Sequence, residues 1–182
     1  MTIPKILKSE VRYRGRVFDL VVDDIEYPSG NTSIREVARH NGGSVIVPLF
    51  ENGDVMLVRQ YRHPVKQYVL ELPAGKLELN EDPLVCAQRE LREETGYEAG
   101  TWKKLISIFT TPGFCSEVLH IFLASGLHAL PSGQALEEGE LTLTIERYPL
   151  AKALEMIQNA EIVDGKTIFG LFLAAGAAAD VI

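Results

Sequence analysis

Cysteine is scarce in this sequence, whose 182 residues contain only Cys86 and Cys115. Two cysteines are too few for the disulfide framework of a small secreted domain or for a cysteine-rich zinc site. Long apolar runs are also absent, since none reaches the ~20 residues that cross a bilayer. The first ten residues, MTIPKILKSE, lack the apolar centre of a signal peptide. We therefore expect a cytoplasmic protein without a membrane partner.

Basic residues are the minority among the charged ones, with 18 Lys and Arg against 25 Asp and Glu and a net charge of -7. No basic stripe offers a footprint for duplex nucleic acid, so we expect no nucleic-acid partner. An acidic protein that handles an anionic ligand needs local arginines or a bound metal ion to reverse the field. The chain length and the 46% hydrophobic fraction suit a globular fold with a substantial core.

The segment 75–97, GKLELNEDPLVCAQRELREETGY, combines a helix pattern with a cluster of acidic residues. Asp82 is a good N-cap, and Pro83 suits the first helical position. Gly96 suits the left-handed residue that commonly follows a helix. Helical spacing predicts one buried face, formed by Leu84, Ala87 and Leu91.

Glu90, Glu93 and Glu94 fall on one side of this helix, because residues three and four apart are neighbours there. Clustered carboxylates repel each other, and a hard divalent cation such as Mg²⁺ or Mn²⁺ offsets that repulsion through its oxygen ligands. A solvated acidic helix is the plainer interpretation of such a charge run. The spacing and the flanking glycine, proline and arginine together favour a metal site. We expect Gly75 to let the backbone turn tightly beside it.

The same segment resembles the signature of the Nudix hydrolases, G-x5-E-x7-R-E-U-x-E-E-x-G-U, in which U is a bulky apolar residue. The matching residues are Gly75, Glu81, Arg89, Glu90, Leu91, Glu93, Glu94 and Gly96. Tyr97 stands where an aliphatic residue is more usual. The resemblance implies an α/β/α sandwich around a mixed sheet, which would extend roughly from Ser44 to the C-terminus.

A Nudix hydrolase uses water to cleave the diphosphate of a nucleoside diphosphate linked to another group, while divalent metal ions neutralise the phosphate oxygens. The resemblance implies that Glu90 and Glu94 are the main metal ligands and that the Ala74 carbonyl is a backbone ligand. Glu93 would bind the metal, directly or through water, or serve as the general base.

The loop 111–117, TPGFCSE, is similar to a loop of the ADP-ribose pyrophosphatases of this family, in which a catalytic glutamate follows Ser/Thr-Pro-Gly. The similarity implies that Glu117 is the general base, with Glu93 as its rival, and that Thr111 contacts the substrate. The residues alone would favour a simpler role for Glu117, an exposed loop acid at the start of a strand.

Arginines are expected to hold the phosphates, because a planar guanidinium can bind two oxygens at once. The segment 59–62, RQYR, resembles the family's RQxR segment and makes Arg62 a candidate phosphate contact. Arg59 is either a second contact or a structural ion-pair partner. Glu78 is either a substrate contact or an exposed loop acid.

Residues Arg35, Glu36 and His40 resemble a segment that, in these enzymes, reaches the ribose and adenine from the partner subunit. The resemblance implies a homodimer in which an N-terminal layer is exchanged. Cross-strand pairing on a sheet surface is the alternative for Arg35 and Glu36. For His40 the alternative is a hydrogen-bonded structural role.

Strand and turn patterns predict an N-terminal antiparallel β layer, residues 1–41. The resemblance implies that a Nudix domain, residues 42–182, follows it. The strands of the layer are expected at 17–22, 25–27 and 32–38. An Asn-Gly hairpin turn is expected at 51–54. The other strands are expected at 44–50, 55–59, 68–72, 105–109, 118–124 and 141–148, and the later helices at 149–158 and 166–175.

The resemblance, which includes the 111–117 loop and the N-terminal layer, implies a Mg²⁺-dependent hydrolase that converts ADP-ribose into AMP and ribose 5-phosphate. GDP-mannose or another nucleotide sugar is the alternative substrate. A non-catalytic ADP-ribose sensor is a further alternative, which the intact signature disfavours.

Overall fold

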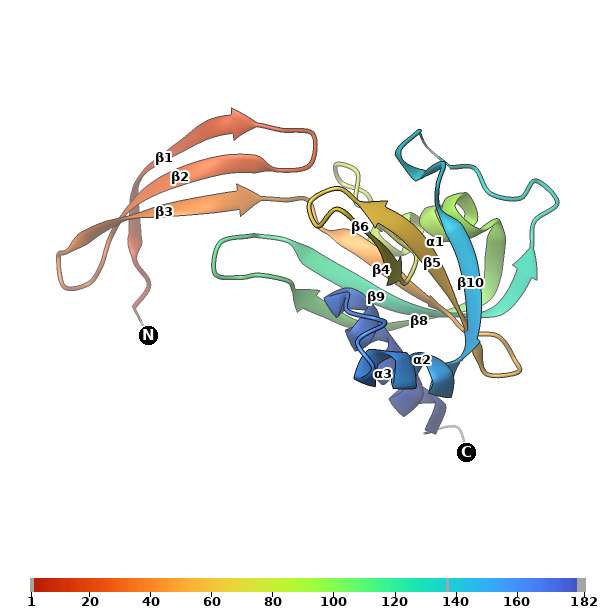
Figure 1. Cartoon of the computed structure of the whole chain (residues 1–182). Coiled ribbons are helices and arrows are strands. Elements are labelled where there is room, and N and C mark those ends of the chain that lie inside the picture. Colours follow the sequence, from red (N-terminus) through yellow and green to blue (C-terminus); the bar gives the residue numbers. More distant parts are fainter. Residues whose placement is uncertain (1, 137, 180–182) are drawn as a thin grey trace. The chain divides into compact units, whose positions relative to one another are not determined.

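A computed structural model describes residues 2–136 and 138–179 of the chain. It divides into two compact units, each of which is described by itself. The first unit contains Met1–Gly42 together with Ile108–Val118, and the second contains Gly43–Ser107 together with Leu119–Ile182. Figure 1 shows the elements of both.

The first unit is built on a three-stranded antiparallel sheet in the order β1-β2-β3. These strands are β1 (Lys5–Arg14), β2 (Asp19–Glu26) and β3 (Thr32–Arg39). Val21 of β2 is buried and pairs with Val11 of β1 and Val37 of β3. The sheet is therefore organised around its central strand.

Two sequence predictions for this sheet were wrong. No strand was expected before residue 17, yet β1 covers Lys5–Arg14. Its sequence, KILKSEVRYR, lacks a clear apolar alternation, and most of the strand is exposed. The strands expected at 17–22 and 25–27 form the single strand β2, because the polar pair Asp23-Asp24 continues the pairing with both neighbours.

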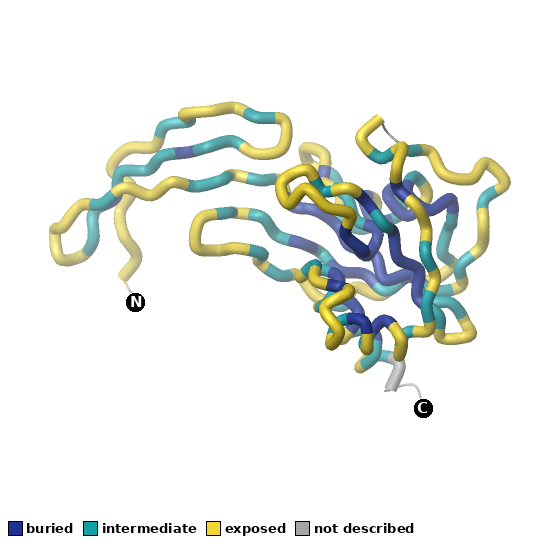
Figure 2. Tube along the Cα trace, viewed as in Figure 1, coloured by how far each residue is buried: buried dark blue, intermediate teal, exposed yellow. Residues whose placement is uncertain are grey.

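The second unit contains a mixed four-stranded sheet in the order β7-β4-β9-β8. Its strands are β4 (Gly43–Pro48), β7 (Ala74–Lys76), β8 (Tyr97–Phe109) and β9 (Val118–Ala129). The end of β8 and the first residue of β9 belong to the segment Ile108–Val118, which is part of the first unit. β4 runs parallel to β9 and antiparallel to β7. Every residue of β4 is buried, as Figure 2 shows. The strand next to the glutamate helix is thus the centre of the core.

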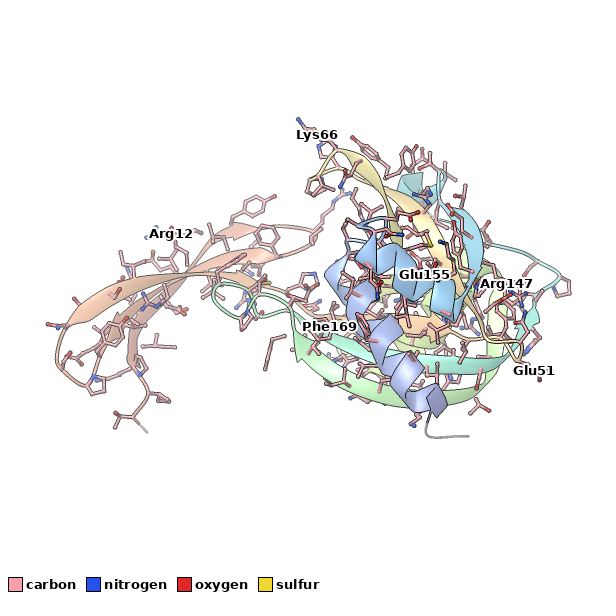
Figure 3. All side chains as sticks on the ribbon, turned by 60° about the horizontal axis from the view of Figure 1, so that its bottom comes forward. Arg12, Glu51, Lys66, Arg147, Glu155 and Phe169 are labelled. Atoms are coloured by element: carbon pink, nitrogen blue, oxygen red, sulfur yellow. The ribbon has the colours of Figure 1, made fainter. Side chains whose placement is uncertain are left out.

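A second, antiparallel sheet in the same unit has the order β10-β5-β6. Its strands are β5 (Asp54–Arg62), β6 (Gln67–Glu71) and β10 (Thr144–Pro149). The predicted Asn-Gly turn joins β4 to β5, and Gly53 adopts the left-handed φ of 83° that such a turn requires. At this end of the sheet Arg147 lies over the Phe50 ring, close to Glu51 (Figure 3).

Three helices complete the second unit: α1 (Pro83–Thr95), α2 (Leu150–Gln158) and α3 (Gly165–Ala179). A 3-10 turn, Glu138–Glu140, precedes β10. No helix within residues 2–136 and 138–179 is long and apolar enough to cross a membrane.

Helices α1 and α3 cover opposite faces of β4. Ile46 packs in one core cluster with Ala87 and Leu91 of α1. A methyl group at Gly170 of α3 would come within 3.1 Å of Val47. Because successive strand residues point to opposite faces, the two helices lie on either side of the sheet (Figure 1). The expected α/β/α sandwich around a mixed sheet is therefore confirmed.

Candidate active site

Helix α1 begins and ends as its sequence predicts. Asp82 accepts hydrogen bonds from the backbone N–H groups of Leu84 and Val85, at 2.8 and 3.3 Å. Gly96 adopts a left-handed φ of 70°, and its N–H donates to the Arg92 carbonyl at 2.8 Å. These caps fix the position of the helix and so the side on which its glutamates project.

Glu90 and Glu94 lie one turn apart on the side of α1 that faces β7. Their exposed fractions are only 7% and 2%. The backbone N–H of Ala74 donates to Glu94 Oε2 at 2.9 Å. Two adjacent carboxylates are thus buried against a strand, which is the reverse of a solvated acidic helix.

Gly75 explains how Glu90 can approach the backbone so closely. A methyl group at Gly75 would lie 1.8 Å from Glu90 Oε1. Gly75 belongs to β7, pairs with Ser44 and does not have a left-handed φ. The expectation of a tight turn at this glycine was therefore wrong. Glycine is needed because any side chain would occupy the place of the Glu90 carboxylate.

Arg89 ties the neighbouring acidic side chains together. Its Nη1 donates to Glu90 Oε1 at 2.6 Å and to Glu93 Oε2 at 3.0 Å. Its Nε and Nη2 donate to the two carboxylate oxygens of Glu81, at 3.1 and 3.2 Å. One guanidinium therefore donates hydrogen bonds to three carboxylates but not to Glu94.

The buried carboxylates hold their protons unusually strongly. Burial, which the charge of Arg89 only partly offsets, raises the pKa of Glu90 to about 7. Burial and then the negative charge of Glu90 raise the pKa of Glu94 to about 8. Glu140, from the 3-10 turn, adds to both shifts. The protein itself thus supplies too little positive charge for this acidic site.

These residues fit a divalent cation. Carboxylate oxygens are the ligands that Mg²⁺ prefers, and the excess of negative charge is what a cation would neutralise. Within the described part of the chain, no three Asp, Glu, His or Cys side chains converge enough to enclose an ion by themselves. Mg²⁺ commonly uses one or two carboxylates and completes its shell with water and phosphate oxygens. The pair Glu90 and Glu94 suits that arrangement.

Arg62 lies in a second charged cluster of the same unit. Its Nε and Nη2 donate to the two oxygens of the buried Glu71, at 2.8 and 2.6 Å. Lys166 of α3 donates to the same carboxylate and to Asp164. Burial would raise the pKa of Glu71, but the hydrogen bonds and charges of Arg62 and Lys166 outweigh it and lower that pKa. Arg62 is thus anchored on one edge.

The outer edge of Arg62 faces a pocket. The Arg62 side chain is 40% exposed, and only its Nε–Nη2 edge is bound to Glu71. Apolar side chains share this pocket with Arg62 and Lys166: Pro64, Val65, Val69 and Val163. The positive charge of Arg62 also acts on Glu94, whose pKa it lowers slightly against the larger effect of burial.

Arg59 and Glu78 are placed differently from the glutamates of α1. Arg59 forms a two-pronged ion pair with Glu146 of β10, at 2.5 and 3.2 Å, as its structural alternative anticipated. Glu78 is exposed, and its backbone N–H donates to Glu81. Both residues lie in the second unit, but neither side chain is hydrogen-bonded to Glu90 or Glu94.

Four further candidates, Arg35, Glu36, Thr111 and Glu117, belong to the first unit. Arg35 donates to Ser33 and to Tyr27 within the sheet, and Glu36 is exposed on β3. The Thr111 carbonyl accepts the backbone N–H groups of two later loop residues. Glu117 Oε1 lies 3.5 Å from a ring nitrogen of His40.

Sequence reasoning missed three charged residues of the second unit: Glu71, Glu140 and Lys166. Glu71 directly precedes the Leu72-Pro73-Ala74-Gly75 run in the sequence, which was a usable signal for it. Glu140 and Lys166 come from segments far along the chain and carry no motif. Only the fold brings their charges to this region.

The fold and site define a class of protein, an α/β/α domain that presents helix carboxylates for a divalent cation. The family model described as NUDIX domain matches residues 40–168. The chain belongs to the Nudix family.

Known relatives cover most of the chain. A methanol dehydrogenase activator of Bacillus methanolicus is 42% identical over 92% of this chain and 90% of its own. An ADP-ribose pyrophosphatase of Bacillus subtilis (strain 168) is 38% identical over the same shares. A GDP-mannose pyrophosphatase of Escherichia coli is 34% identical over 71% of each chain.

A solved structure has the same fold. The crystal structure of an ADP compounds hydrolase superposes with a TM-score of 0.88, at 24% sequence identity. The match covers 99% of this chain and 96% of that one. The fold of this chain therefore has an experimental counterpart.

Proposed function

We propose that this protein hydrolyses the diphosphate of ADP-ribose, giving AMP and ribose 5-phosphate. The observation that carries the proposal is the pair Glu90 and Glu94, buried against β7 where Gly75 leaves room. Such a site suits the chemistry of a highly charged diphosphate. The relative named ADP-ribose pyrophosphatase, with 38% identity over nearly the whole chain, favours this substrate.

The proposed cofactor is Mg²⁺, with Mn²⁺ as a substitute. Glu90, Glu94 and the Ala74 carbonyl would hold it. When bound, such an ion neutralises phosphate oxygens and makes a water molecule more acidic. Arg89 keeps Glu90 and Glu93 in place meanwhile, because its Nη1 donates to both.

Glu117 is the proposed general base, a role that contributes roughly 10²–10⁴-fold to such a reaction. Its rival Glu93 is engaged in an ion pair with Arg89 at 3.0 Å. Glu93 would have to leave Arg89 before its carboxylate could turn toward a water molecule. This difference favours Glu117.

The proposed phosphate contact is Arg62, whose outer edge faces the pocket shared with Lys166. The other proposed substrate contacts are Arg35, Glu36, Arg59, Glu78 and Thr111. Two donors of Arg59 are already bound to Glu146.

A homodimer is part of the proposal. The three-stranded sheet of the first unit leaves large apolar side chains exposed, among them Ile6, Tyr13, Phe18 and Ile34. A sheet this small needs packing against something else for stability. Sedimentation should therefore give the mass of a dimer, and a fully active monomer would refute the exchanged-layer model. A cytoplasmic location, expected from the sequence, also stays a proposal.

GDP-mannose is the second candidate substrate, since a relative at 34% identity is named GDP-mannose pyrophosphatase. A chromatographic panel with Mg²⁺ separates the candidates: ADP-ribose, GDP-mannose, UDP-glucose, NADH and a diadenosine polyphosphate. The matched control is the Glu94→Gln variant from the same purification, which excludes a contaminating hydrolase.

We expect ADP-ribose to be cleaved fastest and EDTA to abolish its cleavage. Preference for GDP-mannose would keep the chemistry and replace the substrate. Tight binding of ADP-ribose without any AMP would instead identify a sensor and refute the enzyme.

A further inference from the structure

Residues 72–74, which we call the crossing segment, connect the two sheets of the second unit. β6 ends at Glu71 and β7 begins at Ala74, so the chain passes here from the sheet β10-β5-β6 to the sheet β7-β4-β9-β8. Leu72 is buried but belongs to neither strand. A buried backbone N–H needs a hydrogen-bond partner, and for Leu72 this partner comes from outside the sheets.

Thr167 of α3 is that partner. The Leu72 N–H donates to Thr167 Oγ1 at 2.8 Å. The Thr167 hydroxyl itself donates to Asp164 Oδ2 at 2.6 Å, which leaves the lone pairs of its oxygen to accept. Thr167 is fully buried, so water does not compete for either bond. Asp164 thus aligns the hydroxyl that holds Leu72.

The first turns of α3 fix this contact in two further ways. Asp164 Oδ2 accepts the Thr167 backbone N–H at 3.0 Å and pairs with Lys166 Nζ at 3.0 Å, so it caps the helix as well. One turn along α3, a methyl group at Gly170 would lie 2.4 Å from Leu72 Cδ1. Helix α3 therefore contacts both the backbone and the side chain of Leu72.

The rest of the crossing segment leads directly to the buried glutamates. The Ile46 N–H donates to the Pro73 carbonyl at 2.9 Å, and the Ala74 N–H donates to Glu94 Oε2 at 2.9 Å. Proline fixes its own φ, so the backbone between Leu72 and Ala74 has little freedom. A shift of Leu72 would therefore move the peptide group that holds Glu94.

We infer that Thr167 is a positioning residue for the cation site: by holding the crossing segment, it keeps Ala74 in place for Glu94. The inference rests on the proposed binding of a divalent cation by Glu90 and Glu94. Thr167 does not touch the cation. It acts through the backbone of the crossing segment, and the start of α3 is in this way part of the site.

Mn²⁺ binding in the absence of substrate tests the inference. Thr167→Val keeps the branched shape of the side chain but neither accepts from Leu72 nor donates to Asp164. We expect it to bind Mn²⁺ roughly 10-fold more weakly than wild type, the low end of what outer-shell partners of metal ligands contribute. Thr167→Ser keeps the hydroxyl and should restore the wild-type affinity. Free Mn²⁺ is counted by electron paramagnetic resonance in conditions under which every variant is folded.

A matched control separates positioning from a loss of stability. Thr167→Val leaves a buried N–H without a partner, so it lowers the free energy of unfolding whatever its effect on the cation. Met56→Ala also lowers it, because Met56 is buried in β5 and its truncation leaves a cavity outside the crossing segment. This control should bind Mn²⁺ as wild type does.

Urea denaturation gives a second measure of the same coupling. One fixed Mn²⁺ concentration should raise the free energy of unfolding less in Thr167→Val than in wild type or Met56→Ala, because the gain depends on affinity for the folded state. If Thr167→Val does not fold, Thr167→Ala replaces it, since alanine is smaller than threonine and favours a helix. The same loss of Mn²⁺ affinity is expected from it.

Failure of the inference and failure of the proposed function give different results. If Glu94→Gln weakens Mn²⁺ binding while Thr167→Val does not, the site stands and the inference is wrong. Equal losses of affinity in Thr167→Val and Met56→Ala, or no restoration by Thr167→Ser, would also overturn the inference. If Glu94→Gln binds Mn²⁺ like wild type, the cation lies elsewhere and both statements fall.

Discussion

Replacing Glu94 with glutamine should stabilise the metal-free protein while it destroys activity. Glu94 is buried beside Glu90, and its pKa rises from 4.5 to about 8. Ionising it in the folded state therefore costs free energy that the unfolded chain does not lose. Glutamine has the same shape, carries no charge and can still accept the Ala74 N–H through its carbonyl oxygen.

The sign of the pH dependence follows from proton binding. Between pH 4.5 and about 8 the folded protein holds more protons at Glu94 than the unfolded chain does, so its stability falls as the pH rises. Above about pH 8 Glu94 is ionised in both the folded and the unfolded state, and the loss of stability reaches its full value. At about 1.4 kcal/mol for each pH unit, the ceiling is about 5 kcal/mol. Relaxation and coupling to Glu90 should reduce the measured gain to about 1–3 kcal/mol.

The assay is urea denaturation in EDTA at pH 5.5 and pH 8.5. Wild type should lose stability between these values, and Glu94→Gln should lose less and be the more stable protein at pH 8.5. Mg²⁺ should stabilise wild type at pH 8.5 but not the variant, because only wild type keeps both carboxylates. The matched control is Glu155→Gln, on the exposed surface of α2 (Figure 3). A variant less stable than wild type at pH 8.5, or an unchanged pH dependence, would refute this account.

Two further substitutions test the surroundings of the pair. Gly75→Ala would place a methyl group 1.8 Å from Glu90 Oε1 and displace that carboxylate. We expect kcat to fall by about 10²-fold while circular dichroism stays native, and wild-type turnover would show that Glu90 needs no close approach. Glu71→Gln leaves Arg62 and Lys166 without their shared carboxylate. The substitution should lower the free energy of unfolding by about 2–3 kcal/mol. This loss is smaller than for a fully buried ion pair, because Arg62 is partly exposed. Glu71→Gln should also raise KM, and an unchanged KM would remove Arg62 from substrate binding.

The sequence was most informative where local chemistry decides the structure. Asp82, Pro83 and Gly96 are sufficient to bound α1, since caps act on their own backbone neighbours. The fully buried strand β4 and the turn at Gly53 were equally plain. Two expected strands, 105–109 and 118–124, were too short: β8 and β9 run over Tyr97–Phe109 and Val118–Ala129. Their additional residues are extended because they pair with adjacent strands, and a local sequence pattern does not reveal such pairing.

Features that depend on contacts between distant residues were not predictable from the sequence. The role of Gly75 depends on a carboxylate fifteen positions away, and the Glu71 carboxylate that anchors Arg62 also accepts from Lys166 of the last helix. The grouping of one distant loop with the N-terminal sheet was also not evident. The loop with Glu117 belongs with the N-terminal sheet although it lies between β8 and β9. Its bonds to Ala38 and His40 join residues more than seventy positions apart.

The most direct test of the central claim measures ion binding and turnover together. Free Mn²⁺ is counted by electron paramagnetic resonance while ADP-ribose hydrolysis is followed in the same samples of wild type, Glu94→Gln and Glu155→Gln. We predict that wild type and Glu155→Gln gain activity in proportion to bound Mn²⁺. Glu94→Gln should bind at least about 10-fold more weakly and lose about 10³-fold in kcat. Wild-type Mn²⁺ binding by Glu94→Gln, or full wild-type turnover in a chelator, would contradict the assignment of this site.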